Sequence, residues 1–158
     1  MAKRSAGILP YKFADDELLV FLVHPGGPYF AKKDAGAWSI PKGEADDEAD
    51  LLAVAKREFR EEIGHEISGE MLALAPVKLK SGKVVSAWAC EAEIDPAAVM
   101  SNTFEMEWPP KSGRRQSFPE IDRGEWFSLD VARSKINSAQ AGFLDQLGAI
   151  LADRGLPS

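Results

Sequence analysis

The chain has 158 residues, of which 45% are hydrophobic and 28% charged, and its formal net charge is −6. This length predicts a single domain over residues 1–158 with a proper hydrophobic core, and the composition is typical of a soluble globular protein. The negative charge argues against broad, sequence-independent binding of nucleic acid.

The expected compartment follows from the cysteine count and from the apolar runs. The single cysteine, Cys90, excludes an internal disulfide and fits a reducing compartment. Because it lies in the apolar run "VVSAWAC", we expect a buried thiol rather than a nucleophile. We find no signal peptide and no apolar stretch long enough to span a bilayer. These features predict a cytoplasmic protein with no membrane partner.

In the first third of the chain, short apolar runs alternate with turn residues. Residues 5–11 and 17–24 are rich in Val, Ile, Leu and Phe, and they predict two strands joined by the turn "KFADD". Residues 25–36 predict a loop because glycine and proline interrupt them. Residues 37–43 predict a short strand that a Pro-Lys-Gly sequence ends.

A helix follows, with apolar residues at three- and four-residue spacing from Leu52 to Ile63. The acidic residues between positions 46 and 50 suit its start, as caps and as charges facing the positive end of the helix dipole. Gly64 suits the left-handed residue that ends a helix. This segment therefore predicts one amphipathic helix with an unusually acidic surface.

The C-terminal half predicts a hairpin, a last strand and two helices. Residues 95–120 form a long irregular connection, and such connections are usually functional or disordered. Interspersed strands and helices with a hairpin predict an α/β fold with a mixed sheet. The expected elements cover residues 71–79, 83–94, 124–129, 130–136 and 139–155.

The acidic face of the helix is the strongest functional signal. Glu58, Glu61 and Glu62 fall within roughly a third of the helix circumference, beside the apolar face. Like charges at this spacing cost about 0.2–0.5 kcal/mol per pair, so something should offset the repulsion. Converging carboxylates on a rigid element suit Mg²⁺ or Mn²⁺. The alternative is a solvated acidic surface paired with Lys56 and Arg60.

The spacing around these glutamates resembles the motif of the Nudix hydrolases. Gly43, the run Arg57-Glu58-Phe59, the pair Glu61-Glu62 and Gly64 all match in register. Two positions depart from the motif, because Ala49 stands where the family has an early Glu and His65 where it has an apolar residue. The resemblance implies an α/β/α sandwich with a mixed sheet, in which the catalytic helix follows a strand and a loop.

The resemblance also implies a reaction and its residues. Nudix enzymes cleave a pyrophosphate bond in a nucleoside diphosphate linked to another group, with divalent metal and water. Glu58 and Glu62 match the principal metal ligands, and Glu61 an additional one. "FPEIDRGEWFSL" resembles a later family segment, in which Glu120, rather than Glu125, is the candidate for a fourth ligand or the base.

Two further motif residues are expected to support this site. Arg57 lies one turn before Glu61 and is expected to orient the glutamates by ion pairing. Gly43 lets the backbone turn into the helix, and in the family its carbonyl often joins the metal shell. We therefore expect Arg57 to act with the catalytic carboxylates and Gly43 with the metal ligands.

Candidate substrate residues come from the loops. Lysines and arginines near the motif or in loops suit the binding of phosphates. Aromatic side chains in loops suit a nucleobase, because stacking of a base on an aromatic ring contributes about 1–3 kcal/mol. Taken singly, each cation fits a solvated loop charge better than a phosphate contact, and each aromatic residue equally fits a loop anchor. Trp38 and Trp88 fit the core instead. The candidates are Lys42, Lys32, Lys33, Lys111, Arg114, Arg115, Tyr29, Phe30 and Trp108.

The substrate class is less sharply indicated. "LLVHPGGPYF" and "WSIPKGE" resemble Nudix hydrolases of the diadenosine polyphosphate type, so we expect a dinucleoside polyphosphate such as diadenosine tetraphosphate. The tyrosine that such enzymes often carry after the motif is absent, as is the corresponding proline of ADP-ribose pyrophosphatases. A housecleaning hydrolase of noncanonical or oxidised nucleoside triphosphates is the runner-up. Nucleoside diphosphate sugars, ADP-ribose and RNA 5′ ends stay open.

A hypothesis of another class is a Nudix-like nucleotide sensor without turnover. Such a protein would lack the metal glutamates. Glu58, Glu61 and Glu62 all persist on the helix, which favours an enzyme acting on a small nucleotide.

Overall fold

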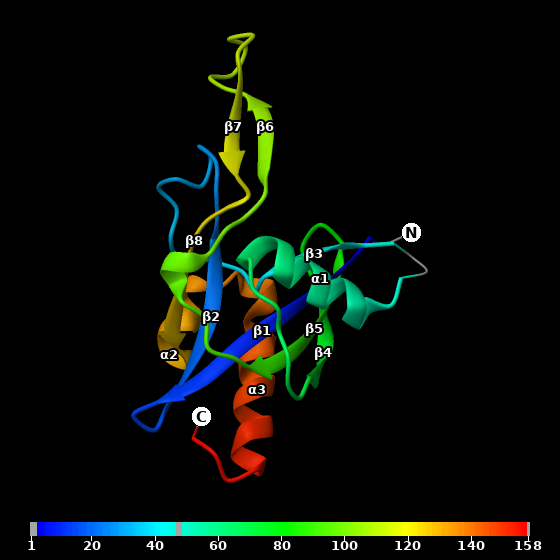
Figure 1. The fold of residues 1–158 in the computed structure, drawn as a ribbon, viewed down its shortest axis with the longest axis vertical. Coiled ribbons are helices and arrows are strands. Elements are labelled where there is room, and N and C mark those ends of the chain that lie inside the picture. The colour runs from blue at the N-terminus through cyan, green and yellow to red at the C-terminus, as the bar shows by residue number, and fades with distance from the viewer. Residues whose placement is uncertain (1–2, 47–48, 158) are drawn as a thin grey trace.

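The structure of the protein, a computed structural model, describes residues 3–46 and 49–157. Most of these residues form one large sheet with helices on both faces, and a separate hairpin projects from this body (Figure 1). The elements in chain order are β1 (Arg4–Ala14), β2 (Glu17–Pro25), β3 (Lys42–Ala45), α1 (Leu51–Ile63), β4 (Leu72–Lys78), β5 (Val84–Glu91), the 3₁₀ helix η1 (Pro96–Ala98), β6 (Thr103–Glu107), β7 (Arg115–Pro119), β8 (Ile121–Ser128), α2 (Leu129–Lys135), the 3₁₀ helix η2 (Ser138–Gln140) and α3 (Ala141–Asp153).

The large sheet has the strand order β4-β5-β1-β2-β8, and β3 also pairs with β1. The β1–β5 pair is parallel and the other pairs are antiparallel, so the predicted mixed sheet is confirmed. Residues 11–14 of β1 pair with β2, whereas residues 4–7 pair with β3 on the same edge. The strand β3 therefore pairs with the part of β1 that β2 leaves unpaired. This pairing places Gly43, the first residue of the motif, at the edge of the sheet.

Alternating residues of the strands build a core on each face of the sheet. On β1, Leu9 packs into the cluster covered by α2 and α3, whereas Ile8 packs into the cluster covered by α1. Both side chains are fully buried, and burying one such side chain contributes about 1.5–3 kcal/mol. Trp38 lies in the first core as expected, and the half-buried Trp88 packs against the second. The expected three-layer sandwich is confirmed.

The helix α1 begins and ends through local capping. Asp50 accepts hydrogen bonds from the backbone N–H groups of Leu52 and Ala53, and Gly64 follows the last residue in the left-handed region at φ 75°. The expectation for Gly64 is confirmed. The expected start is wrong for Asp46, which precedes the helix and leaves its first turn without an acidic residue. Asp47 and Glu48 lie outside the described residues.

Two further expectations about elements are wrong. Within the expected strand 37–43, residues 37–41 make only isolated bridges, at Trp38 and Ser39, whereas residues 42 and 43 belong to the regular strand β3, which begins after Pro41. The expected irregular connection 95–120 contains the antiparallel hairpin of β6 and β7, which stands away from the body in Figure 1. The described part of the chain has no helix long and apolar enough to cross a membrane.

Candidate active site

The carboxylates of α1 meet β3 and the segment before β8. Glu62, one turn after Glu58, is mostly buried, and this burial is the largest cause that raises its pKa to about 8. The nearby charges of Glu58 and Glu120 raise that pKa further, whereas Lys42 lowers it through its charge and a backbone hydrogen bond. The fold therefore brings Lys42 and Glu120, which come from other parts of the chain, close to the two glutamates of α1.

Glu58 contacts Arg57 on one side and packs against the strand β3 on the other. The guanidinium of Arg57 donates to its Oε1 at 3.3 Å, so Arg57 pairs with Glu58 and not with Glu61, the expected partner. Burial raises the pKa of Glu58, the hydrogen bond from Arg57 lowers it, and the charge of Glu61 raises it again. The adjacent guanidinium thus partly offsets the repulsion among the carboxylates.

Gly43 is required by close packing rather than by a turn. It lies inside β3, where an added Cβ would collide with the carboxyl group of Glu58. The strand therefore lies directly against this carboxylate, and a side chain at position 43 would push it away. The expectation that Gly43 forms a turn into the helix is wrong, because the strand continues to Ala45.

A small cavity opens beside these groups. It has a volume of about 170 Å³ and is lined by Lys42, Glu62 and Glu120, together with Pro25 and Ile121. Glu62 Oε2 is buried and has no hydrogen-bond partner among the described residues. Such an oxygen costs free energy unless a ligand satisfies it.

The donor set fits a hard divalent cation, although no three acidic, histidine or cysteine side chains among residues 3–46 and 49–157 already form a coordination shell. Carboxylate oxygens are the ligands that Mg²⁺ and Mn²⁺ prefer. Glu62 contributes an oxygen that has no hydrogen bond to any described residue, and the carboxyl group of Glu58 lies against the backbone of Gly43. Both features suit an ion at the edge of β3.

Most of the expected substrate residues lie either in the loop 25–36 or in the projecting hairpin of β6 and β7. Tyr29 and Trp108 meet edge to face with their ring centroids 5.3 Å apart, which joins the loop 25–36 to the hairpin. In the same loop Lys33 lies over the ring of Phe30 at 5.4 Å. The exposed Arg114 and Arg115 belong to the projecting hairpin and not to the cavity beside Glu62 (Figure 1).

His24 is a structural residue of the site that sequence reasoning missed. Its ring is 1% exposed, with Nδ1 2.8 Å from Asp122 Oδ1 and Nε2 2.6 Å from the carbonyl oxygen of Lys33. A carbonyl oxygen only accepts, so Nε2 carries a proton. His24 therefore connects the loop 25–36 to Asp122 of β8, which lies two residues after Glu120. The sequence shows only that a histidine ends an apolar run and does not indicate its partners.

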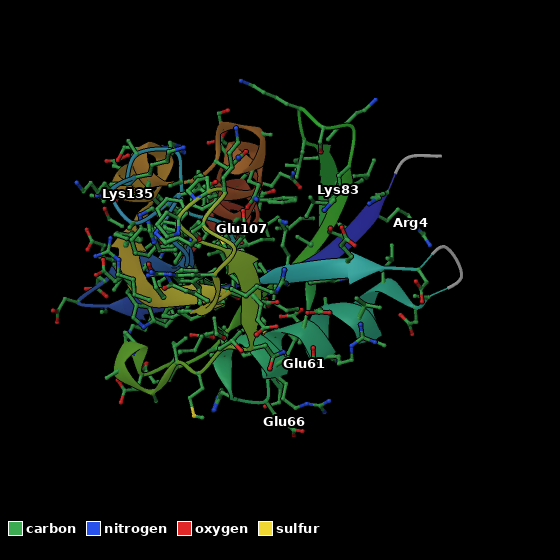
Figure 2. All side chains as sticks on the ribbon, turned by 90° about the horizontal axis from the view of Figure 1, so that it is seen from above. Arg4, Glu61, Glu66, Lys83, Glu107 and Lys135 are labelled. Atoms are coloured by element: carbon green, nitrogen blue, oxygen red, sulfur yellow. The ribbon has the colours of Figure 1, made fainter. Side chains whose placement is uncertain are left out.

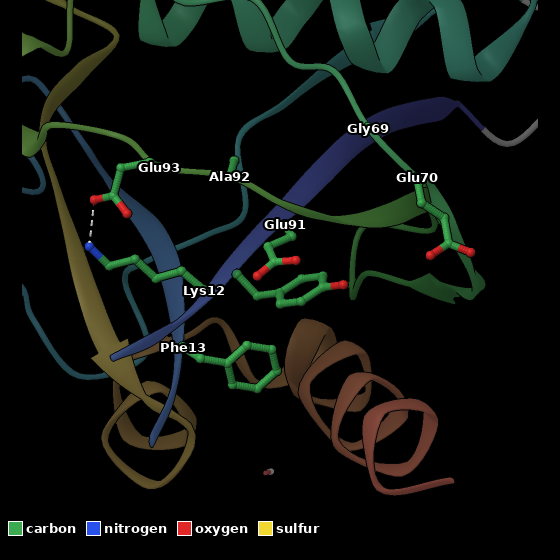
Figure 3. A pocket seen from close by; sticks show the side chains of 8 residues that line it. Lys12, Phe13, Gly69, Glu70, Glu91, Ala92 and Glu93 are labelled. Carbon is green, nitrogen blue, oxygen red and sulfur yellow. Dashed lines mark hydrogen bonds and ion pairs between the residues drawn. The ribbon is translucent and has the colours of Figure 1, made fainter. Parts of the chain in front are cut away.

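Cavity size alone does not identify the site. A larger hollow, of about 470 Å³, lies beside Tyr11 and Lys12 (Figure 3). It contains none of the candidate residues, and its Glu93 already pairs with Lys12 at 2.8 Å. The perturbed carboxylates at Glu58 and Glu62 are the better guide.

Comparison with known proteins agrees with this geometry. The family model described as the NUDIX domain matches residues 1–147, which is most of the chain. The chain therefore belongs to the Nudix family. It is accordingly a Nudix hydrolase of nucleoside diphosphate-linked substrates. A comparison with curated protein sequences gave no match.

Several solved structures share the fold. The Ap4A hydrolase of C. elegans in a binary complex is 19% identical, with a TM-score of 0.67 over 96% of this chain and 99% of that chain. The NUDIX domain of Shewanella oneidensis NrtR, complexed with ADP ribose, is 17% identical, with a TM-score of 0.57 over 98% and 88%. A structure described as MutT from Aliivibrio salmonicida and Vibrio cholerae is 16% identical, with a TM-score of 0.55 over 93% and 96%. At these identities the likeness concerns the fold.

Proposed function

We propose that residues 1–158 act as a single Nudix hydrolase domain that cleaves a pyrophosphate bond in a nucleoside polyphosphate. The observation that carries the proposal is the approach of Glu58, Glu62 and Glu120 to one another at the edge of β3. Structural carboxylates are rarely gathered with a buried oxygen left unpaired, as Oε2 of Glu62 is within the described part of the chain, whereas catalytic sites depend on such groups.

In this proposal Mg²⁺ or Mn²⁺ is held by Glu58 and Glu62, with Glu61, Glu120 and the carbonyl of Gly43 as further ligands. The buried Oε2 of Glu62 supports the assignment, because it has no other partner among the described residues. When bound, the ion neutralises phosphate charge and lowers the pKa of water.

The chain's own residues perform the remaining tasks. Glu120 lines the cavity and accepts the proton of the attacking water. Arg57 holds the carboxylate of Glu58 through the 3.3 Å contact, and Lys42, which also lines the cavity, meets the negative charge of a phosphate. The catalytic residues are then Arg57, Glu58, Glu61 and Glu120.

The substrate that we favour is a dinucleoside polyphosphate such as diadenosine tetraphosphate. The sequence resemblance supports this choice, and so does the fold shared with the C. elegans Ap4A hydrolase over nearly the whole chain. The exposed Tyr29, which contacts the half-buried Trp108, offers a stacking surface for a base in the same loop as Lys33. Arg114 and Arg115 serve a distant part of a long substrate.

The test is a product-resolved hydrolysis panel with Mg²⁺ and with Mn²⁺. It contains diadenosine tetraphosphate, ordinary and oxidised nucleoside triphosphates, ADP-ribose and a sugar nucleotide, with Glu62→Gln as the inactive variant. Turnover of the dinucleotide that the variant loses by about 100-fold or more supports the proposal. Preference for a triphosphate moves the protein to the housecleaning class. Tight nucleotide binding without any turnover supports the sensor.

A further inference from the structure

Three lysines surround one carboxylate near the candidate site. Lys83 Nζ lies 2.9 Å from Glu44 Oε1, and the Lys83 side chain is only 22% exposed. The hydrogen bond from Lys83 is the largest cause that lowers the pKa of Glu44, and the charges of Lys3 and Lys42 lower it further. This lysine cluster carries three positive charges and one negative charge, although the whole chain is acidic.

The sheet fixes the members of the cluster relative to one another. Alternation along β3 puts Lys42 and Glu44 on one face and turns Gly43 toward α1. The N–H of Val84 donates to the carbonyl of Lys3 at 2.9 Å, which brings Lys3 to the start of β5 and to Lys83. In Figure 2, β3 runs between α1, which carries the labelled Glu61, and the labelled Lys83.

Lys42 connects the lysine cluster to the candidate active site. Burial is the largest cause that lowers its pKa, the charge of Lys83 lowers it further, and Glu62 raises it. Lys42 also lines the cavity that contains Glu62 and Glu120. Lys42 is therefore close enough to both Glu62 and Lys83 for their charges to shift its pKa.

The ion pair between Lys83 and Glu44 accounts for one of the three positive charges. Glu62 lies near Lys42, and no carboxylate among the described residues is paired with Lys3 by a contact of this kind. The excess charge adjoins a site that cleaves pyrophosphate, and lysine binds phosphate as a point charge. We propose that Lys42, Lys83 and Lys3 form a subsite for substrate phosphates that lie beyond the cleaved bond. The subsite makes longer polyphosphate chains bind more tightly. This inference rests on the proposed function and extends it to chain length.

The test compares binding of inorganic tripolyphosphate with that of pyrophosphate. Affinity is measured by titration calorimetry with Mg²⁺ at fixed ionic strength, and product formation is followed in parallel. The variants are Lys83→Gln and Glu44→Gln, which break the same ion pair but change the charge in opposite directions. Lys80→Gln is the matched control, because Lys80 is an exposed cation in the turn between β4 and β5.

Lys83→Gln is expected to weaken the binding of tripolyphosphate about 5-fold more than the binding of pyrophosphate, because it removes a positive charge. Glu44→Gln is expected to strengthen the binding of tripolyphosphate about 2- to 5-fold, because it removes a negative charge. Lys80→Gln should change both affinities less than about 2-fold. If Lys83→Gln and Glu44→Gln shift affinity in the same direction, the ion pair is structural and the subsite is refuted. The same holds if Lys83→Gln behaves like Lys80→Gln. Opposite shifts without hydrolysis of any nucleotide support the subsite and refute the proposed function.

Discussion

Replacing Glu62 by Gln should stabilise the protein when divalent ions are absent. The pKa of Glu62 is raised from 4.5 to about 8, first by burial and then by the charges of Glu58 and Glu120. The folded state therefore holds a proton that the unfolded chain releases, so the free energy of unfolding falls as pH rises from 4.5 toward 8. A pH of 7 is about 2.5 units above the pKa of this carboxyl group in the unfolded chain. This difference lowers the free energy of unfolding by about 3 kcal/mol.

Glutamine removes this loss because it has no proton to release. We expect Glu62→Gln in EDTA to raise the melting temperature by about 6–12 °C at pH 7 and to leave it nearly unchanged at pH 4. Circular dichroism melting curves between pH 4 and 8 measure the effect, and Glu66→Gln, with a side chain 81% exposed in the wild type, is the control. With Mg²⁺ or Mn²⁺ the order should reverse, because only the wild type gains the full stabilisation by the ion.

Two results would refute this reasoning. If Glu62→Gln lowers the melting temperature at pH 7 in EDTA, the carboxylate is stabilised by partners other than a metal. If the wild type and the variant show parallel pH curves, Glu62 does not titrate in the predicted range. Either outcome removes the raised pKa of Glu62 as support for a metal at this position.

Three other substitutions test neighbouring parts of the site. Gly43→Ala should cost about 1–3 kcal/mol in a denaturant titration and lower turnover at least about 10-fold, because the added methyl group collides with Glu58. Glu120→Gln should lower kcat about 100-fold or more with little change in the melting curve, whereas the exposed Glu125→Gln should leave kcat unchanged; equal effects would contradict the role of Glu120. His24→Phe should cost about 1–3 kcal/mol in the same titration, since it leaves the carbonyl oxygen of Lys33 without its donor and removes the contact with Asp122, and an unchanged free energy of unfolding would contradict this.

The local part of the site could be predicted from the sequence. The side chains of Glu58 and Glu62 share a face of the helix whatever surrounds it, because four residues span about one turn. Gly64 ends the helix for an equally local reason, since the left-handed conformation favours glycine. Glu120 came from the family resemblance, because its approach to α1 depends on the pairing of β2 with β8, which spacing alone does not give.

The missed features depend on distant pairing or on a pattern that was overlooked. His24 meets Asp122 across 98 residues of sequence, so no local signal predicts the contact. The hairpin did leave a signal, because Phe104, Met106 and Trp108 alternate with acidic residues as in a strand with one apolar face. The prolines and cations that follow Trp108 obscured this period, and they lie in the turn between β6 and β7 and at the start of β7.

The projecting hairpin has a consequence for the timescale of opening. Two strands alone are marginally stable in water, so β6 and β7 depend on contacts at their base. There the N–H of Glu120 donates to Asn102 and the N–H of Gly26 donates to Glu120, each at 2.9 Å. Amide hydrogens of the hairpin and of the loop 25–36 should therefore exchange with solvent together, and faster than those of β1. Glu120 lies at the junction, so the same local opening that exchanges these amides also releases the backbone that positions its carboxylate.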